Sequence, residues 1–191
     1  MKRLRLFIGV VLCLLTGLAT GCAICGDSDK NEVALQGFVK VQQLNAKGKI
    51  IKSSKINKNA MVLVSCKIYA IDKSGKSKLI YSPRVTSVWN KEATVALNDN
   101  YNPENPIYKL SCLILNQDAV KSSKLKLAKN EVMVSCRAVI IGNNEKFKKL
   151  PRLDSVYSNK EQLNRTFESF HYLPKGWDRK VLMKAEDVKF K

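Results

Sequence analysis

The fold is decided by the stretch MVLVSCKIYAI, residues 61–71. Every second side chain in it is apolar, from Val62 to Ala70, whereas the other face mixes polar and apolar residues. This period of two is typical of a β-strand with one face in a core. The sequence DKSGK, residues 72–76, follows and predicts a hairpin turn in which Gly75 adopts a positive φ.

The same pattern returns further along the chain. VSCK at residues 64–67 recurs as VSCR at 134–137, and KSSK at 52–55 recurs as KSSK at 121–124. Two more echoes are PRVTSVW (83–89) with PRLDSVY (151–157), and NKE (90–92) with NKE (159–161). Matching residues lie roughly 70 positions apart, with small drifts that loop insertions would cause, so the chain contains two tandem copies.

Each copy contains several short strands separated by turn sequences, such as the hairpin predicted around the turn at residues 45–48. We therefore predict an all-β fold of two tandem β modules of roughly 70 residues, sandwich-like or small barrel-like. Turn formers and two prolines crowd residues 98–106, which places a boundary there. The expected organisation is a signal peptide (1–21), a tether (22–34), a first β repeat (35–104), and a second β repeat with a C-terminal tail (105–191).

Residues 159–170 fit two structures. SNKE at 158–161 has the form of a helix capping box, and Leu163, Phe167 and Phe170 would share one helical face. The counterpart at residues 90–97 is rich in β-formers and predicts a turn followed by a strand. We expect strands in both copies, with a short helix near 159–170 as the alternative.

The N-terminus has the three parts of a secretory signal peptide. Basic residues at positions 2, 3 and 5 precede an apolar run of 13 residues, 6–18, and small residues then lead to Cys22. The apolar run is shorter than the ~20 residues that a membrane-spanning helix needs.

The sequence LATGC, residues 18–22, resembles the lipobox of bacterial lipoproteins, in which the cysteine is lipidated and becomes the new N-terminus. The resemblance implies lipid attachment at Cys22, and a membrane-anchored lipoprotein of the cell envelope that faces the periplasm or the exterior. The alternative is cleavage of an ordinary signal peptide, which would give a secreted protein, eukaryotic sources included.

SPRVT at residues 82–86, followed by NKEATV at 90–95, resembles a signature of secretins, the outer-membrane gates of secretion systems and pili. This secretin-like segment, residues 82–97, implies a strand-turn-strand unit and an envelope setting. The chain has no room for that family's membrane hairpins, so no channel is implied. The expected role is a structural or assembly component, with a connection to secretion.

Without residues 1–21 the chain keeps 31 Lys and Arg against 16 Asp and Glu, a net charge of +15. This balance favours anionic partners, and an alternative role is a binding module for anionic envelope polymers or a lipid surface. The duplicated Lys52, Lys55, Lys121 and Lys124 are the candidate anion-binding residues, unless they are simply solvated surface. Nucleic acid is not an expected partner, because a secreted chain rarely meets it.

Four cysteines remain outside the signal peptide and the lipobox: Cys25, Cys66, Cys112 and Cys136. Cys66 and Cys136 are equivalent in the two copies, whereas the counterpart of Cys112 falls near Gln42. One bridge repeated in both copies is therefore excluded. Cys112 and Cys136 are the candidate disulfide, with burial of free thiols as the alternative.

No pattern for catalysis is present. The single histidine, His171, has no nucleophile elbow, glycine-rich phosphate loop or acidic pair near it in the sequence. Zinc-ligand spacing occurs only at Cys22 and Cys25, at the expected anchor. We therefore predict a non-enzymatic protein without a metal or another cofactor.

Overall fold

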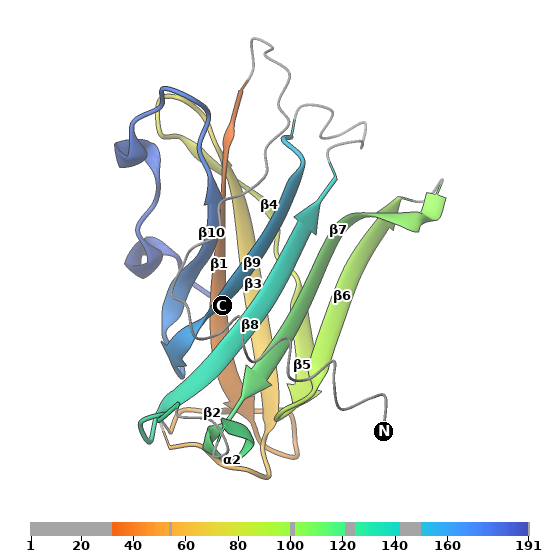
Figure 1. The fold of residues 1–191 in the computed structure, drawn as a ribbon, viewed down its shortest axis with the longest axis vertical. Coiled ribbons are helices and arrows are strands. Elements are labelled where there is room, and N and C mark those ends of the chain that lie inside the picture. Colours follow the sequence, from red (N-terminus) through yellow and green to blue (C-terminus); the bar gives the residue numbers. More distant parts are fainter. Residues whose placement is uncertain (1–31, 54, 100–101, 121–124, 142–149, 191) are drawn as a thin grey trace.

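The computed structural model describes residues 32–53, 55–99, 102–120, 125–141 and 150–190. Two antiparallel sheets pack face to face (Figure 1), which confirms the all-β prediction. The predicted hairpin turns at residues 45–48 and 72–76 are present, with Gly48 and Gly75 at positive φ. The turn expected from Gly142 to Asn144 lies outside the described residues.

The first sheet has the strand order β10 (Thr166–Tyr172), β1 (Ala34–Leu44), β3 (Met61–Ile71) and β4 (Ser77–Tyr81). β5 (Arg84–Val88) pairs with the other half of β3, and β2 (Ile50–Ile51) pairs with the end of β1. The second sheet has the order β6 (Glu92–Asp99), β7 (Asn102–Leu115), β8 (Glu131–Ile140) and β9 (Leu153–Gln162). A four-residue helix, α2 (Gln117–Val120), follows β7.

Residues 159–170 contain the end of β9, a turn and the start of β10. The strand prediction for this segment is therefore correct, and the alternative of a short helix near 159–170 is wrong. Phe167 and Phe170 are three residues apart on β10, yet both rings lie in the core, because a β-bulge in the β1–β10 ladder places one extra residue between them. Helical spacing alone could not reveal this.

Each sheet contains strands from both copies. The first copy supplies β1, β3, β4 and β5 to one sheet, and the second copy supplies β7, β8 and β9 to the other. The last strand of each copy is exchanged, because β10 pairs with β1 and β6 pairs with β7. The structure thus corrects the boundary expected between 35–104 and 105–191: it falls inside β7, and neither range completes a sheet alone.

Two turns carry the exchanged strands from one sheet to the other. Asn90 lies between β5 and β6 at φ 65°, and Asn164 lies between β9 and β10 at φ 66°. The Asn90 N–H donates to the Ile114 carbonyl at 2.9 Å, and the Asn164 N–H donates to the Val41 carbonyl at 2.9 Å. Each turn is therefore bonded to the sheet that receives its strand.

These two acceptors are equivalent positions. Val41 pairs with Val64, and Ile114 pairs with Val134, the matching residues of the two VSC sequences. The sandwich thus has an approximate internal twofold symmetry.

The core lies between the sheets and is built from the alternating positions of their strands. Val64 and Val134 are 1% and 0% exposed, and Cys66 and Cys136 are 1% and 3% exposed. Equivalent positions therefore have equivalent burial, as the shared period of two requires. β-branched residues dominate these positions because they pack well on a pleated surface. Each buried Val contributes about 1.5–3 kcal/mol relative to an exposed one.

The C-terminal tail, residues 173–190, covers the outer face of the first sheet and contains two short 3-10 turns, η3 (Arg179–Val181) and η4 (Ala185–Asp187). It is the blue segment at the left of Figure 1. The fully buried amide of Gln36 donates to the Met183 carbonyl at 3.0 Å and accepts from the Met183 N–H at 2.9 Å. The Lys67 ammonium donates to the Lys189 carbonyl at 2.7 Å.

Candidate functional site

Four connecting segments meet at the end of the sandwich that carries β2 and α2, the lower end in Figure 1. They are residues 45–60, 89–91, 116–130 and 163–165. The first two belong to the first copy and the other two to the second. We call this surface the basic end.

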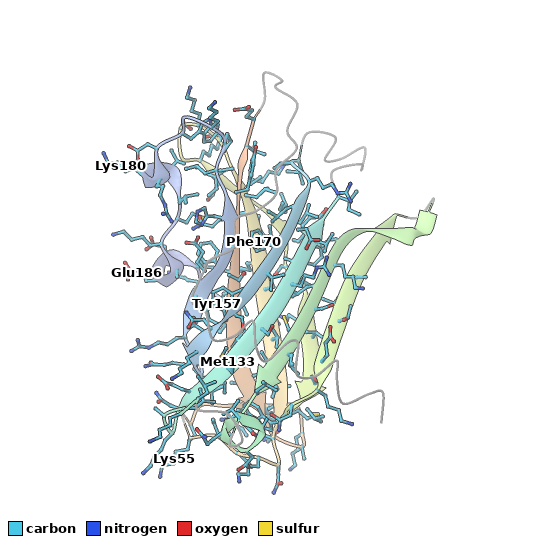
Figure 2. All side chains as sticks on the ribbon, in the orientation of Figure 1. Lys55, Met133, Tyr157, Phe170, Lys180 and Glu186 are labelled. Atoms are coloured by element: carbon cyan, nitrogen blue, oxygen red, sulfur yellow. The ribbon has the colours of Figure 1, made fainter. Side chains whose placement is uncertain are left out.

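Cations dominate the basic end. Among the described residues of its four segments there are nine Lys and Arg and a single acidic residue, Asp118. The cations are Lys47, Lys49, Lys52, Lys55, Lys58, Lys91, Lys126, Lys129 and Arg165. Figure 2 shows Lys55 extending from this end of the molecule. Both copies contribute, so the arrangement depends on the way the two copies are packed together.

A pocket of about 320 Å³ lies at the basic end, between the segment 52–60 of the first copy and the segment 116–130 of the second. Its apolar lining comes from Ile56, Leu127 and Ala128. Its charged lining comes from Lys55, Lys58, Asp118 and Lys129, and Asn116 and Gln117 complete it.

Two buried amides fix the shape of the connecting segments. Gln43 is fully buried; its Nε2 donates to the Lys55 carbonyl at 2.9 Å and its Oε1 accepts from the Asn57 N–H at 2.6 Å. Asn116, 4% exposed, accepts from the Asp118 N–H at 3.1 Å through its Oδ1. The two amides occupy equivalent positions in the two copies. Gln43 follows Gln42, which pairs with Leu63, and Asn116 follows Leu115, which pairs with Met133. Hydrogen bonds from these two buried amides therefore fix the backbone conformation of the segments that line the pocket.

The two sides of the pocket are joined by an ion pair between Lys58 and Asp118. The side chain of Lys58 is 68% exposed, so this pair contributes at most about 1 kcal/mol to stability. Gln117 adds a further constraint, because its Oε1 accepts from the Leu127 N–H at 2.7 Å. With three lysines against one aspartate, the pocket lining keeps a net positive charge.

The structure places only some of the residues expected from the sequence. Lys55 lines the pocket and Lys52 is exposed on the same segment. Lys121, Lys124 and Cys22 lie outside the described residues. Lys58 and Lys129 were not singled out by sequence reasoning, although they flank the duplicated KSSK sequences.

Cys112 and Cys136 come together. They lie directly opposite each other on β7 and β8, 2% and 3% exposed, with their Sγ atoms 2.7 Å apart. Cys66, on the other sheet, lies opposite Val39 and is contacted by the Tyr108 hydroxyl at 3.8 Å. Burial raises the pKa of the Cys66 thiol to about 12.

The strand pairing shows that the counterpart of Cys112 in the first copy is Val39, and that the prediction of a residue near Gln42 was wrong. Cys136 pairs with Cys112, and its equivalent Cys66 pairs with Val39. The difference arises because the connection between the paired strands is shorter in the second copy: 27 positions separate Val39 from Cys66, whereas 24 separate Cys112 from Cys136. No cysteine in the first copy can therefore reproduce the pair.

His171 lies on β10 and forms a 2.5 Å contact with the Glu168 carboxylate through Nδ1. The other oxygen of Glu168 accepts from Gln36 at 3.0 Å, so this histidine belongs to the hydrogen-bond network beneath the C-terminal tail. In the part of the chain that the structure describes, no three His, Cys, Asp or Glu residues are arranged to hold a metal ion. Within the same part, no helix has the length and apolar character to cross a membrane.

The secretin-like segment forms β5, the Asn90 turn and β6. It is therefore the connection that carries the last strand of the first copy into the second sheet. Comparisons with protein-family models, curated proteins and solved structures find no match.

Proposed function

We propose that this protein is a non-enzymatic lipoprotein of the cell envelope, a structural or assembly component that binds an anionic envelope polymer through its basic end. The observation that supports this proposal is the excess of nine cations over one acid in the described segments of that end. Such a surface attracts polyanions over about one Debye length, roughly 8 Å at physiological ionic strength.

A polymer fits this surface better than a small anion. The lysines are exposed and belong to both copies, so each single contact is weak. A chain of repeated negative charges can engage several of them at once, and the linked contacts increase the overall affinity. The pocket between the copies would accept one repeating unit of such a chain.

The direction of β1 favours a partner away from the anchoring membrane. β1 begins at Ala34, and its last residues pair with β2 at the basic end. A strand of 11 residues is about 36 Å long. A lipid at Cys22 would therefore attach the protein through the opposite end of the sandwich, with the basic end facing away from that bilayer.

Substitution of the four duplicated lysines tests the binding. The variant Lys52→Gln, Lys55→Gln, Lys121→Gln, Lys124→Gln should elute from a heparin column at lower salt than the wild type, and its retention should depend less steeply on salt. The control removes four exposed lysines elsewhere: Lys73→Gln, Lys76→Gln, Lys78→Gln, Lys175→Gln. Equal shifts for the two variants would show that only net charge matters and would refute a site at the basic end.

The anchor is tested separately. Cys22→Ala should move the protein from the membrane fraction to the soluble fraction of cells. A wild type that is already soluble, or a variant that stays with the membranes, would remove the lipoprotein part of the proposal and leave the binding part intact.

A further inference from the structure

The thiols of Cys112 and Cys136 are placed for a covalent bond. Their Cα atoms are directly opposite in the antiparallel β7–β8 ladder. Directly opposite residues have Cα atoms about 4.5–5.5 Å apart, within the range that disulfides span. Both side chains point to the core face, and their Sγ atoms are 2.7 Å apart.

We propose that Cys112 and Cys136 are an oxidation site that forms a disulfide between the two central strands of the second sheet, while Cys66 stays a thiol. Cys66 is not a competing partner, because Val39 stands opposite it on β1 and its thiol is in contact with the Tyr108 hydroxyl. This inference does not depend on the proposed function.

The oxidant is a disulfide, either of glutathione or of a thiol-disulfide exchange protein. One cysteine thiolate attacks the oxidant and forms a mixed disulfide, which releases one oxidant thiol. The second cysteine then attacks the sulfur of the first, which forms the Cys112–Cys136 bond and releases the second oxidant thiol. The two thiol protons of the protein are transferred to the two released sulfurs, so the exchange is balanced.

Burial determines when this exchange can occur. The two residues are 2% and 3% exposed, so an oxidant cannot reach them in the closed sandwich. The hydrogen bond with Cys136 and then burial raise the pKa of the Cys112 thiol, which removes the reactive thiolate from the folded state. The bond must therefore form during folding, before the core closes, and the folded reduced protein should resist oxidation.

Differential labelling can test the pairing, because trypsin places the three core cysteines on separate peptides, residues 59–67, 110–121 and 130–137. The full chain is denatured, reduced and refolded with oxidised glutathione. It is then unfolded and alkylated with iodoacetamide, reduced, and alkylated with N-ethylmaleimide. Peptides 110–121 and 130–137 should carry the maleimide label, and should be joined to each other before reduction, whereas peptide 59–67 should carry the iodoacetamide label.

Two variants identify the partners. Cys66→Ser should leave the joined pair unchanged, and Cys112→Ser should move Cys136 to the iodoacetamide label. The proposal is overturned if Cys112 and Cys136 both carry the iodoacetamide label in the wild type, if either carries only glutathione, or if peptide 59–67 is joined to one of them. Labelling takes place in denaturant, so the reagents reach every cysteine whether or not a variant folds, and the wild-type result alone decides the pairing.

Discussion

Asn90 and Asn164 hold the left-handed backbone conformation on which both crossing turns depend. Asparagine adopts this region more readily than most residues, because its short side chain can bond locally. The Asn90 Oδ1 also accepts from the Asn116 N–H at 3.0 Å, and the Asn164 Nδ2 donates to the Ser53 carbonyl at 3.5 Å. One residue type thus provides both the turn and a side-chain bond to a connecting segment of the other copy.

Asn90→Val should lower the free energy of unfolding by about 1–3 kcal/mol, because a β-branched residue at positive φ is strained. Asn164→Val should have a similar effect, since the two turns are equivalent. Asn90→Gly should cost less, because glycine accepts the backbone conformation and only the side-chain bond is lost. Urea denaturation measures all three. A valine variant as stable as the glycine variant would contradict the role of the positive φ.

Sequence comparison of the two copies does not align Asn90 with Asn164. The echo NKE pairs Asn90 with Asn159, but Asn159 lies within β9, and the equivalent turn is at Asn164. Twelve residues connect β8 with β9, whereas five connect β3 with β4. This difference in loop length shifts the register of everything that follows in the second copy. The VSC identity therefore matched structurally equivalent positions, whereas the NKE identity after the longer loop did not.

The C-terminal tail covers an apolar patch on the outer face of the first sheet. Phe38 and Ile71 are fully buried, although neither belongs to the core between the sheets. Phe38 packs edge-on against Tyr69, with ring centroids 6.1 Å apart. The tail lies over this face and is fixed there by Gln36 and Lys67.

Deletion of residues 175–191 should expose this outer face. We expect the free energy of unfolding to fall by roughly 3 kcal/mol, about the value of one or two large apolar side chains returned to water. Binding of the dye ANS should increase at the same time. Glu186→Gln, a change at an exposed tail residue, should alter neither quantity. A deletion variant with unchanged stability and no added dye binding would show that the tail does not protect the sheet.

Strands were the most predictable elements, because alternation identifies a half-buried strand from its own residues, as in β3 and β8. The docking of the tail was not predictable. Its residues show no regular period, and its main attachment uses backbone groups of Met183, which every residue possesses. The candidate site was partly predictable: the KSSK repeat led to the right segments, but a pocket between the copies requires knowledge of their packing.

The exchange of β6 and β10 links the two copies into one folding unit. A cleavage between residues 99 and 102 would cut the chain at the connection of β6 and β7. Every sheet would still contain strands of both fragments, and the paired strands would keep their hydrogen bonds and buried side chains.

A protease site inserted at residues 100–101 tests this arrangement. After cleavage, the two fragments should coelute in size-exclusion chromatography under native conditions and separate only in denaturant. Two independent modules would instead elute as separate half-size species, which would contradict the exchange. The uncleaved insertion variant is the control for the effect of the inserted residues.

The exchange was beyond sequence reasoning because periodicity reveals which residues face a core but not which strand lies beside them. Tandem copies suggest separate modules, since each copy contains enough strands for a small sheet. The crossing turns instead carry the last strand of each copy into the other sheet, and their backbone bonds to Val41 and Ile114 attach them there. Such bonds have no side-chain signature.

The exchange of the last strands also determines whether the folding stability depends on protein concentration. A chain containing one copy alone, with the same pairing, could complete its sheet only by taking a strand from a second molecule, so its folding would be bimolecular and would fail on dilution. Residues 100–101 join the copies and turn that encounter into an intramolecular one, at a constant effective concentration. The full chain can then remain folded as a single molecule at any abundance.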